Sequence, residues 1–130
     1  MDRVGNEKLS AMNIMVPVAA NVTINEAEIV AINTDGYAVP ASKAEGIIVA
    51  GCSLEYADNT TGADGDTTVH VRRGAFVWDN DGTIKETDIL KSCYVSDKNT
   101  VTLTAEGSSK AGTILAVDPD GVTVDMTTAH

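Results

Sequence analysis

Acidic side chains around residue 80 have the spacing in this chain that comes nearest to a recognised chemistry. Asp79, Asp81 and Gly82 match part of the calcium-binding loop in which carboxylates alternate ahead of an invariant glycine. In that alignment Asp88 falls at the end of the loop, whereas the first ligand position falls on Val77, whose side chain has no oxygen. Aspartate is also common in turns, because its side chain bonds the nearby backbone. Asp79, Asp81 and Asp88 are therefore kept as metal candidates, but the sequence predicts no bound metal and no other cofactor.

The loop at 57–66 is the longest polar segment and holds a second group of oxygen-bearing side chains, Asp58, Asn59, Asp64 and Asp66. Its content of glycine, threonine and aspartate is typical of a surface loop. A calcium site and an ordinary turn-rich loop are both compatible with this composition.

Residues suited to catalysis are few. The sequence contains none of the short motifs of nucleophilic, zinc-dependent or nucleotide-binding enzymes. His70 alternates with Val69 and Val71, so a strand would place it on the face opposite to theirs. The other histidine is His130. We therefore expect that this protein is not an enzyme.

The two cysteines, Cys52 and Cys93, are too far apart in sequence to form a CxxC metal or redox motif. Buried free thiols are the expected state, because cysteine is among the most frequently buried residues. A disulfide between them is left open by the sequence. Free thiols would fit assembly in a reducing compartment.

Phe76 and Trp78 stand two residues apart, so a strand would place both rings on one face. They serve either as core or as anchors of a protein interface, where large rigid aromatic side chains carry much of the binding energy. Arg72 and Arg73 are the one adjacent basic pair and lie just before them. This pair either ends a strand in solvent or receives carboxylates from a neighbouring copy. The candidate subunit interface is therefore Arg72, Arg73, Phe76 and Trp78.

The composition describes an acidic chain of 130 residues with a net charge of -10, of which 43% are hydrophobic and only 4% aromatic. A core of small aliphatic side chains suits thin β-sheet packing. Acidic residues outnumber basic ones in both halves, so no basic patch is available for nucleic acid or for an anionic membrane surface. The apolar run at 12–20 is too short to span a bilayer, and the acidic residues before it argue against a secretion signal.

A short phrase occurs twice along the chain and indicates two related β-hairpins. Residues 44–50 (AEGIIVA) and 111–116 (AGTILA) each lead, across turn-forming residues, to an alternating run at 66–71 and 120–125. Other short apolar runs are separated by turn signals, and one segment, 85–92, has the character of a helical turn. The pattern predicts an all-β fold, a small β-barrel or β-sandwich.

The first residues differ from the rest of the chain. Residues 1–12 are polar and lack alternation, which predicts a flexible N-terminal arm in front of a single β domain at 13–130. Pro17 removes a backbone donor from the first apolar run, and proline within a sheet is confined to edges. We therefore expect the first strand at the edge of its sheet.

The order of these segments resembles that of the small head decoration proteins of tailed bacteriophages, also called capsid cement or stabilising proteins. The resemblance is carried by GIIVAG at 46–51, by TTVHVRRGAFVWD at 67–79, and by CYVSD, GTILAV and VTVDM in the second half. In that family an apolar Gly-Ile strand, a long loop and a Val-x-Val…Gly-x-Phe strand precede a shorter echo of the same hairpin. The resemblance covers 14–126, and the loop at 57–66 is unusually long for the family.

The resemblance implies a structural virion protein, made in the host cytoplasm, that binds the outer surface of an icosahedral capsid as a homotrimer. Its partner would be the major capsid protein, with no role for nucleic acid or membrane. The implied fold is a compact β-barrel or β-tulip-like domain whose N-terminal arm helps attachment. An apolar edge could add a strand to the shell by β-augmentation. The expected capsid contacts are Met12, Ile14, Val16 and Pro17.

A competing hypothesis is an extracellular β-sandwich that binds a glycan or a receptor, with calcium in its acidic loops. One Trp, one Phe and three Tyr make a thin aromatic platform for sugar binding. Such a module would lose stability when calcium is removed, which distinguishes it from a capsid protein.

Overall fold

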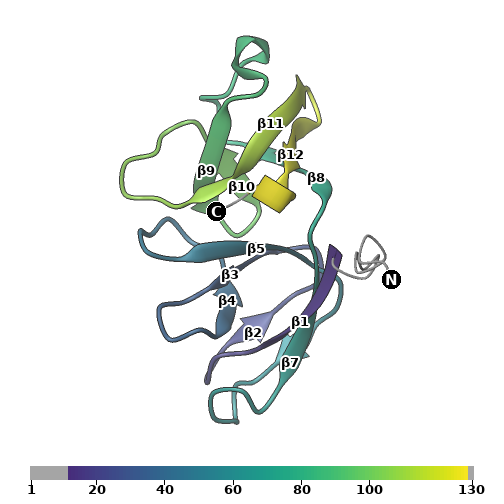
Figure 1. The fold of residues 1–130 in the computed structure, drawn as a ribbon, viewed down its shortest axis with the longest axis vertical. Helices are drawn as coiled ribbons and strands as arrows, with labels where there is room; N and C mark the ends of the chain where they lie inside the picture. Colours follow the sequence, from purple (N-terminus) through teal and green to yellow (C-terminus); the bar gives the residue numbers. More distant parts are fainter. Residues whose placement is uncertain (1–11, 129–130) are drawn as a thin grey trace, which may run out of the picture.

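Two lobes of β-structure, which contribute to one apolar cluster, make up this protein (Figure 1). The computed structural model describes residues 12–128. The first lobe contains β1 (Asn13–Pro17), β2 (Thr23–Ile24), β3 (Ile29–Ile32), β4 (Ala38–Pro40), β5 (Ile48–Ser53), β6 (Ala57–Asp58) and β7 (Thr68–Arg72). The second contains β8 (Ala75–Asn80), β9 (Ser92–Asp97), β10 (Thr100–Thr102), β11 (Lys110–Asp118) and β12 (Gly121–Asp125), with the 3₁₀ helices η3 (Glu86–Asp88) and η4 (Met126–Thr128).

The first lobe is a five-stranded sheet in the order β1-β7-β5-β3-β4, accompanied by the small β2-β6 pair. All neighbouring strands of the sheet run antiparallel. Side chains alternate between its two faces, and Val30, Val69 and Val71 lie in an apolar cluster on one of them. The sheet curls toward closure, because Val18, just after β1, bridges Ala38 of β4.

The second lobe is a closed barrel in the order β10-β8-β12-β11-β9. Its strands pair antiparallel except at β10 and β8, whose parallel pairing completes the ring. Trp78, Ile114 and Val124 are buried in its apolar cluster. The Trp78 indole Nε1 donates to Met126 Sδ at 3.3 Å, so the aromatic ring is fixed against η4.

Strand β3 lies between two apolar clusters and connects the lobes. Val30 belongs to the cluster of its own lobe, whereas Ile29 and Ala31 belong to the cluster that contains Cys93 of the barrel. This follows from the two-residue period of a strand, which sends neighbouring side chains to opposite faces. The backbone N–H of Ile29 also donates to the Lys98 carbonyl at 2.7 Å. The barrel therefore packs against one face of the sheet.

The all-β prediction is confirmed, and the repeated phrase locates real neighbours. β11 and β12 form the expected hairpin, and β5 and β7 lie side by side and antiparallel. The first pairing is short, with Cys52 opposite Arg72 and Ser53 opposite Val71. The segment between them is not all loop, because β6 begins at Ala57. The helical turn expected at 85–92 is the 3₁₀ helix η3.

β1 occupies one edge of the sheet, as Pro17 predicted. Residues 1–11 of the expected arm lie outside the described residues, and the arm's last residue, Met12, is exposed directly before β1. Within the predicted domain at 13–130, the described part forms both lobes.

Candidate interaction surfaces

Of the acidic residues around position 80, Asp81 has a turn-forming role. The Asp81 carboxylate accepts hydrogen bonds from the Thr83 backbone N at 3.0 Å and from the Thr83 Oγ1 at 2.6 Å. Partial burial acts to raise the pKa of Asp81, but hydrogen bonds from Thr102 and Thr83 outweigh it and hold the pKa below its ordinary value. Asp79 is exposed on β8. Among residues 12–128, no three His, Cys, Asp or Glu side chains are grouped so that they could hold a metal ion.

Asp88, the third metal candidate, is buried and caps η3. Its Oδ2 accepts from the Lys85 backbone N at 2.8 Å, and its Oδ1 accepts from the Lys91 Nζ at 3.0 Å. These hydrogen bonds, that from Lys85 first, hold the pKa of the Asp88 carboxyl below its usual range. The bonds to η3 and Lys91 give this carboxylate a structural role.

The loop after β6 is organised by Asn59, which nothing in the sequence distinguishes from the other polar residues of the loop. Asn59 is buried, and its Nδ2 donates to the carbonyl oxygens of Val18, Ala19 and Ala63 at 3.0, 3.1 and 2.9 Å. The Asp64 Oδ1 accepts a further hydrogen bond from the Ala20 backbone N at 2.8 Å. The polar side chains of Asn59 and Asp64 therefore fix this loop against the backbone of residues 18–20, which connects β1 to β2.

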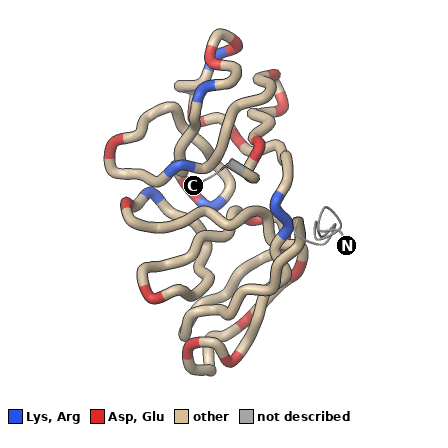
Figure 2. Tube along the Cα trace, viewed as in Figure 1, with Lys and Arg blue, Asp and Glu red and all other residues tan. Residues whose placement is uncertain are grey.

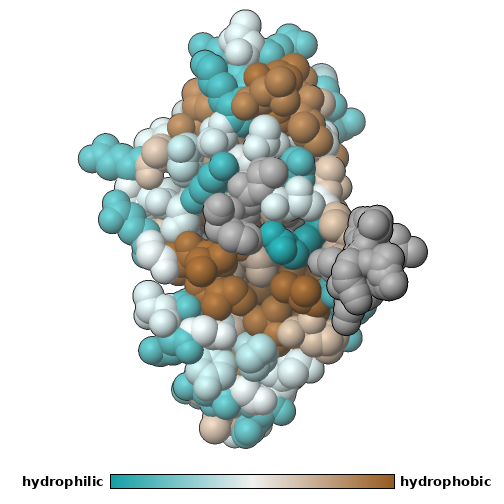
Figure 3. Space-filling model, viewed as in Figure 1, coloured by the Kyte–Doolittle hydropathy of each residue, from teal (hydrophilic) through white to brown (hydrophobic). Residues whose placement is uncertain are grey.

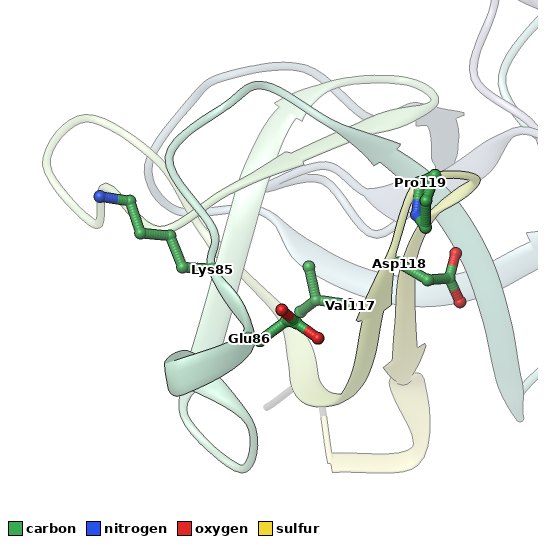
Figure 4. Close-up of a pocket in the computed structure, with 5 residues that line it drawn as sticks. All are labelled: Lys85, Glu86, Val117, Asp118 and Pro119. Atoms are coloured by element: carbon green, nitrogen blue, oxygen red, sulfur yellow. The ribbon is translucent and has the colours of Figure 1, made fainter.

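An open recess of about 580 Å³ lies between η3 and the β11–β12 hairpin. It is lined by Lys85, Glu86, Val117, Asp118 and Pro119, and in Figure 4 the Lys85 side chain extends away from the other four. None of these five residues is a serine, threonine, cysteine or histidine. The lining combines the apolar side chains of Val117 and Pro119 with the charged side chains of Lys85, Glu86 and Asp118.

The reactive side chains lie apart from this recess. His70 is half-buried on the face of β7 opposite to Val69 and Val71, as the alternation predicted. Cys52 and Cys93 are both free and buried in the cluster that connects the lobes. Burial raises the pKa of both thiols, that of Cys93 to about 12. Such thiols are poor nucleophiles at neutral pH.

The structure places the aromatic pair in the core, which was one of the two alternatives. Trp78 is only 5% exposed, and its ring centroid lies 6.3 Å from that of Phe76, which packs against the same cluster. The proposed interface role of Trp78 is therefore wrong, because its side chain fills the barrel. Arg72 is exposed, and Arg73 Nη2 donates to the Thr127 carbonyl at 3.4 Å.

The expected capsid contacts on β1 divide between its two faces. Val16 is buried in the cluster of the first lobe, so its side chain is corrected to core, whereas Ile14 is half-buried and packs against that cluster. Met15, which the sequence argument passed over, is 58% exposed. Met12 is exposed and Pro17 half-buried. The edge was predicted correctly, but the outward face of the strand was not.

A second group of exposed apolar residues, absent from the sequence predictions, lies on the outside of the barrel. It consists of Val77, Ile89, Leu90 and Leu115, called the barrel stripe below. Figure 3 shows brown, apolar areas on the barrel lobe at the top and on the sheet lobe below, separated by a paler and more polar band. In the sequence, the stripe could have been suspected only from the adjacent aliphatic residues Ile89 and Leu90.

No protein-family model, curated protein or solved structure matches this chain. Within residues 12–128 there is no helix with the length and apolar character needed to cross a bilayer.

Proposed function

We propose that this protein is a structural component of a phage virion that binds the outside of an icosahedral capsid as a trimer and stabilises it. The observation that carries the proposal is the outer edge of β1 ahead of Val18, whose bridge to Ala38 lies just beyond the end of the strand. In the described part of the chain, β1 pairs with β7 on one side and ends the sheet on the other.

The alternation of hydrogen bonds along β1 identifies the backbone N–H and C=O groups on that edge. The Arg73 backbone N donates to the Met12 carbonyl, and the Val18 backbone N donates to the Thr67 carbonyl, at 2.6 and 2.8 Å. In an antiparallel pair every second residue bonds its partner strand, so the residues between point their backbone groups outward. Asn13 and Met15 are therefore the residues whose N–H and C=O face away from β7.

These groups form a short template for an added strand. An extended segment of another protein can bond the outward backbone groups of both residues, as in β-augmentation. Pro17 has no N–H, so it limits the template at its C-terminal end. One such contact is small, but three linked subunits engage several sites at once and gain avidity.

The first test is the mass of the purified protein by multi-angle light scattering, with and without a calcium chelator. A trimer has about three times the 13.5 kDa mass of the chain and is expected to be unchanged by the chelator. A monomer that loses stability on chelation overturns the proposal in favour of the calcium-dependent binding module.

The second test is co-sedimentation with empty heads built from the major capsid protein of the same phage. Met15→Pro removes an outward N–H without touching the ladder to β7, and Met15→Thr is its matched control because it loses the same side chain but keeps the N–H. We expect Met15→Pro to bind at least tenfold more weakly than Met15→Thr. Equal binding by the two variants contradicts attachment through this edge.

A further inference from the structure

The residues of the barrel stripe lie on neighbouring segments around the outside of the second lobe. Val77 pairs with Thr123, which in turn pairs with Ala116, the neighbour of Leu115. On the other side of β11, the Leu90 backbone N donates to the Ile114 carbonyl at 2.7 Å. These registers place the four exposed residues on neighbouring segments, with the half-buried Thr123 and Ala116 between Val77 and Leu115. Apolar surface gathered in this way on a soluble protein commonly marks a contact site.

Two of its leucines are held outward by irregular backbone. Leu90 is 72% exposed and has a φ of 73°, a left-handed conformation that is strained for a residue with a side chain. Leu115 is the extra residue of a bulge, where the register of β11 against β12 shifts between Ile114 and Ala116. Neither leucine gains burial within its own subunit from this arrangement, which indicates a contact outside it.

A second surface, which we call the arginine face, lies on the first lobe. Met15 pairs with His70 across β1 and β7, and the Leu54 backbone N donates to the His70 carbonyl at 2.9 Å. Arg72 lies one residue pair further along β7, on the same face as His70. The arginine face consists of Met15, Leu54, His70 and Arg72. Figure 2 shows the basic segment where β7 leads into β8, near the junction of the lobes.

The charges around the two surfaces are opposite. Around the barrel stripe, Asp79, Glu86 and Asp118 are exposed. The cations nearby are Lys85, on the rim of the recess, and Lys91, whose Nζ is engaged by the carboxylate that caps η3. The stripe is thus an apolar surface with a mainly acidic border.

The arginine face has the reverse character. Arg72 is exposed there in a chain of net charge -10, and Arg73 follows it. Glu55 also lies at this face, and its Oε2 accepts from the His70 backbone N at 3.0 Å. Opposite charge around matching apolar surfaces selects partners and their orientation.

We propose that the barrel stripe of one subunit binds the arginine face of the next subunit, and that three such head-to-tail contacts close the trimer. The inference rests on the proposed function, because it takes the trimer as given. Two different patches make a heterologous contact, and such contacts form a ring when the rotation between subunits closes. The arginine face is formed by side chains on one face of the sheet, whereas the capsid contact uses backbone groups at the edge of β1. A subunit can therefore bind its neighbour through the face and the capsid through the edge.

The experiment uses two variants that each disable one patch. Leu90→Asn removes the apolar side chain and keeps a residue that tolerates the left-handed backbone. Arg72→Glu reverses the charge of the arginine face. Light scattering is expected to show each variant alone as a monomer, with a circular dichroism spectrum equal to that of the wild type. Ile48→Asn is the control, because Ile48 is exposed but belongs to neither surface, and it should remain a trimer.

Mixing the two variants separates a head-to-tail contact from a self-complementary one. The Leu90→Asn subunit keeps its arginine face and the Arg72→Glu subunit keeps its stripe, so an equimolar mixture should form a dimer of about twice the 13.5 kDa chain mass. Two monomers that do not associate on mixing overturn the head-to-tail contact. If both variants remain trimers, the proposed contact between the barrel stripe and the arginine face is wrong, but the proposed capsid function is not affected. A wild-type monomer instead overturns the trimer itself, and with it both proposals.

Discussion

Glu28 and Lys98 form an ion pair across the junction of the two lobes, with Glu28 Oε2 3.0 Å from Lys98 Nζ. Glu28 is buried before β3, and its carboxylate also accepts from the Asn25 backbone N at 3.0 Å and the Asn25 Nδ2 at 3.2 Å. The Lys98 carbonyl receives the Ile29 N–H in the same place. The turn between β9 and β10 is thereby tied to the start of β3, and the barrel is held in one position over the sheet.

Removing the lysine should cost more than neutralising the acid. Lys98→Met leaves a buried carboxylate without its cation, and we expect a loss of about 2 kcal/mol in the free energy of unfolding. Glu28→Gln keeps an oxygen for Asn25 and leaves Lys98, whose side chain is 45% exposed, to be hydrated, so the expected loss is about 1 kcal/mol. Urea unfolding followed by the fluorescence of Trp78 measures both. A larger loss for Glu28→Gln contradicts the assignment of Glu28 as the buried partner.

Gly112 cannot carry a side chain where β11 crosses β12. A Cβ on Gly112 would overlap the backbone oxygen of Asp125 and lie 2.7 Å from Val124 Cγ1. Because a backbone oxygen cannot move aside as a side chain can, Gly112→Ala should destabilise the fold by at least about 3 kcal/mol. Gly82→Ala is the matched control, since Gly82 also has a positive φ but no atom within 4 Å, and should cost about 1 kcal/mol. Equal losses for the two variants in chemical denaturation would show that packing is not the constraint.

Asp88 should make stability depend on acid pH. Its pKa is lowered in the folded state by the bonds from Lys85 and Lys91, so the stabilisation is fully present above the ordinary pKa of 3.8 and is lost as the pH falls through the folded value. Asp88→Asn should therefore have a lower melting temperature than the wild type at pH 7. The gap should shrink below about pH 4. A gap that stays constant down to pH 2 would mean that the charge of Asp88 does not contribute.

Cys93 should resist thiol reagents until the protein unfolds. Burial raises its pKa to about 12, and Cys52 shares the same apolar cluster with a raised pKa. Neither thiol should react with Ellman's reagent at pH 8, and both should react in denaturing urea. The raised pKa also means that stabilisation is present below the ordinary value of 9.0 and falls as the pH rises toward 12. Cys93→Ala should reduce that alkaline loss, and rapid labelling of the native protein would contradict the burial of both thiols.

The local pattern of the chain was sufficient to predict its secondary structure and part of its topology. Turn residues and two-residue alternation predict an all-β fold, and the repeated phrase identifies the β11–β12 hairpin and the β5–β7 neighbours. Pro17 predicts the edge position of β1 without any knowledge of its partner, because a missing N–H can be tolerated only where no ladder needs it. These features depend on backbone chemistry within a few residues.

The surfaces required the tertiary structure, because the same alternation fits a strand facing either way. Trp78 turns into the barrel, and the β1 face that carries Met15 is left uncovered because the barrel rests on β3 and β5. The alternation alone predicts neither the burial of Trp78 nor the exposure of Met15. The barrel stripe depends on a bulge at Leu115, where the register of β11 against β12 shifts, and on the left-handed backbone of Leu90.

The sequence by itself determined the β-architecture, the acidity and the edge position of the first strand. Only the tertiary structure decided which side chains are core and which are surface, and it alone joined Glu28 to Lys98. The physical reason is that hydrogen-bonding and turn preferences act along the chain, whereas burial is a property of what folds over each face. Contacts between segments distant in sequence therefore determine which residues remain available to a partner.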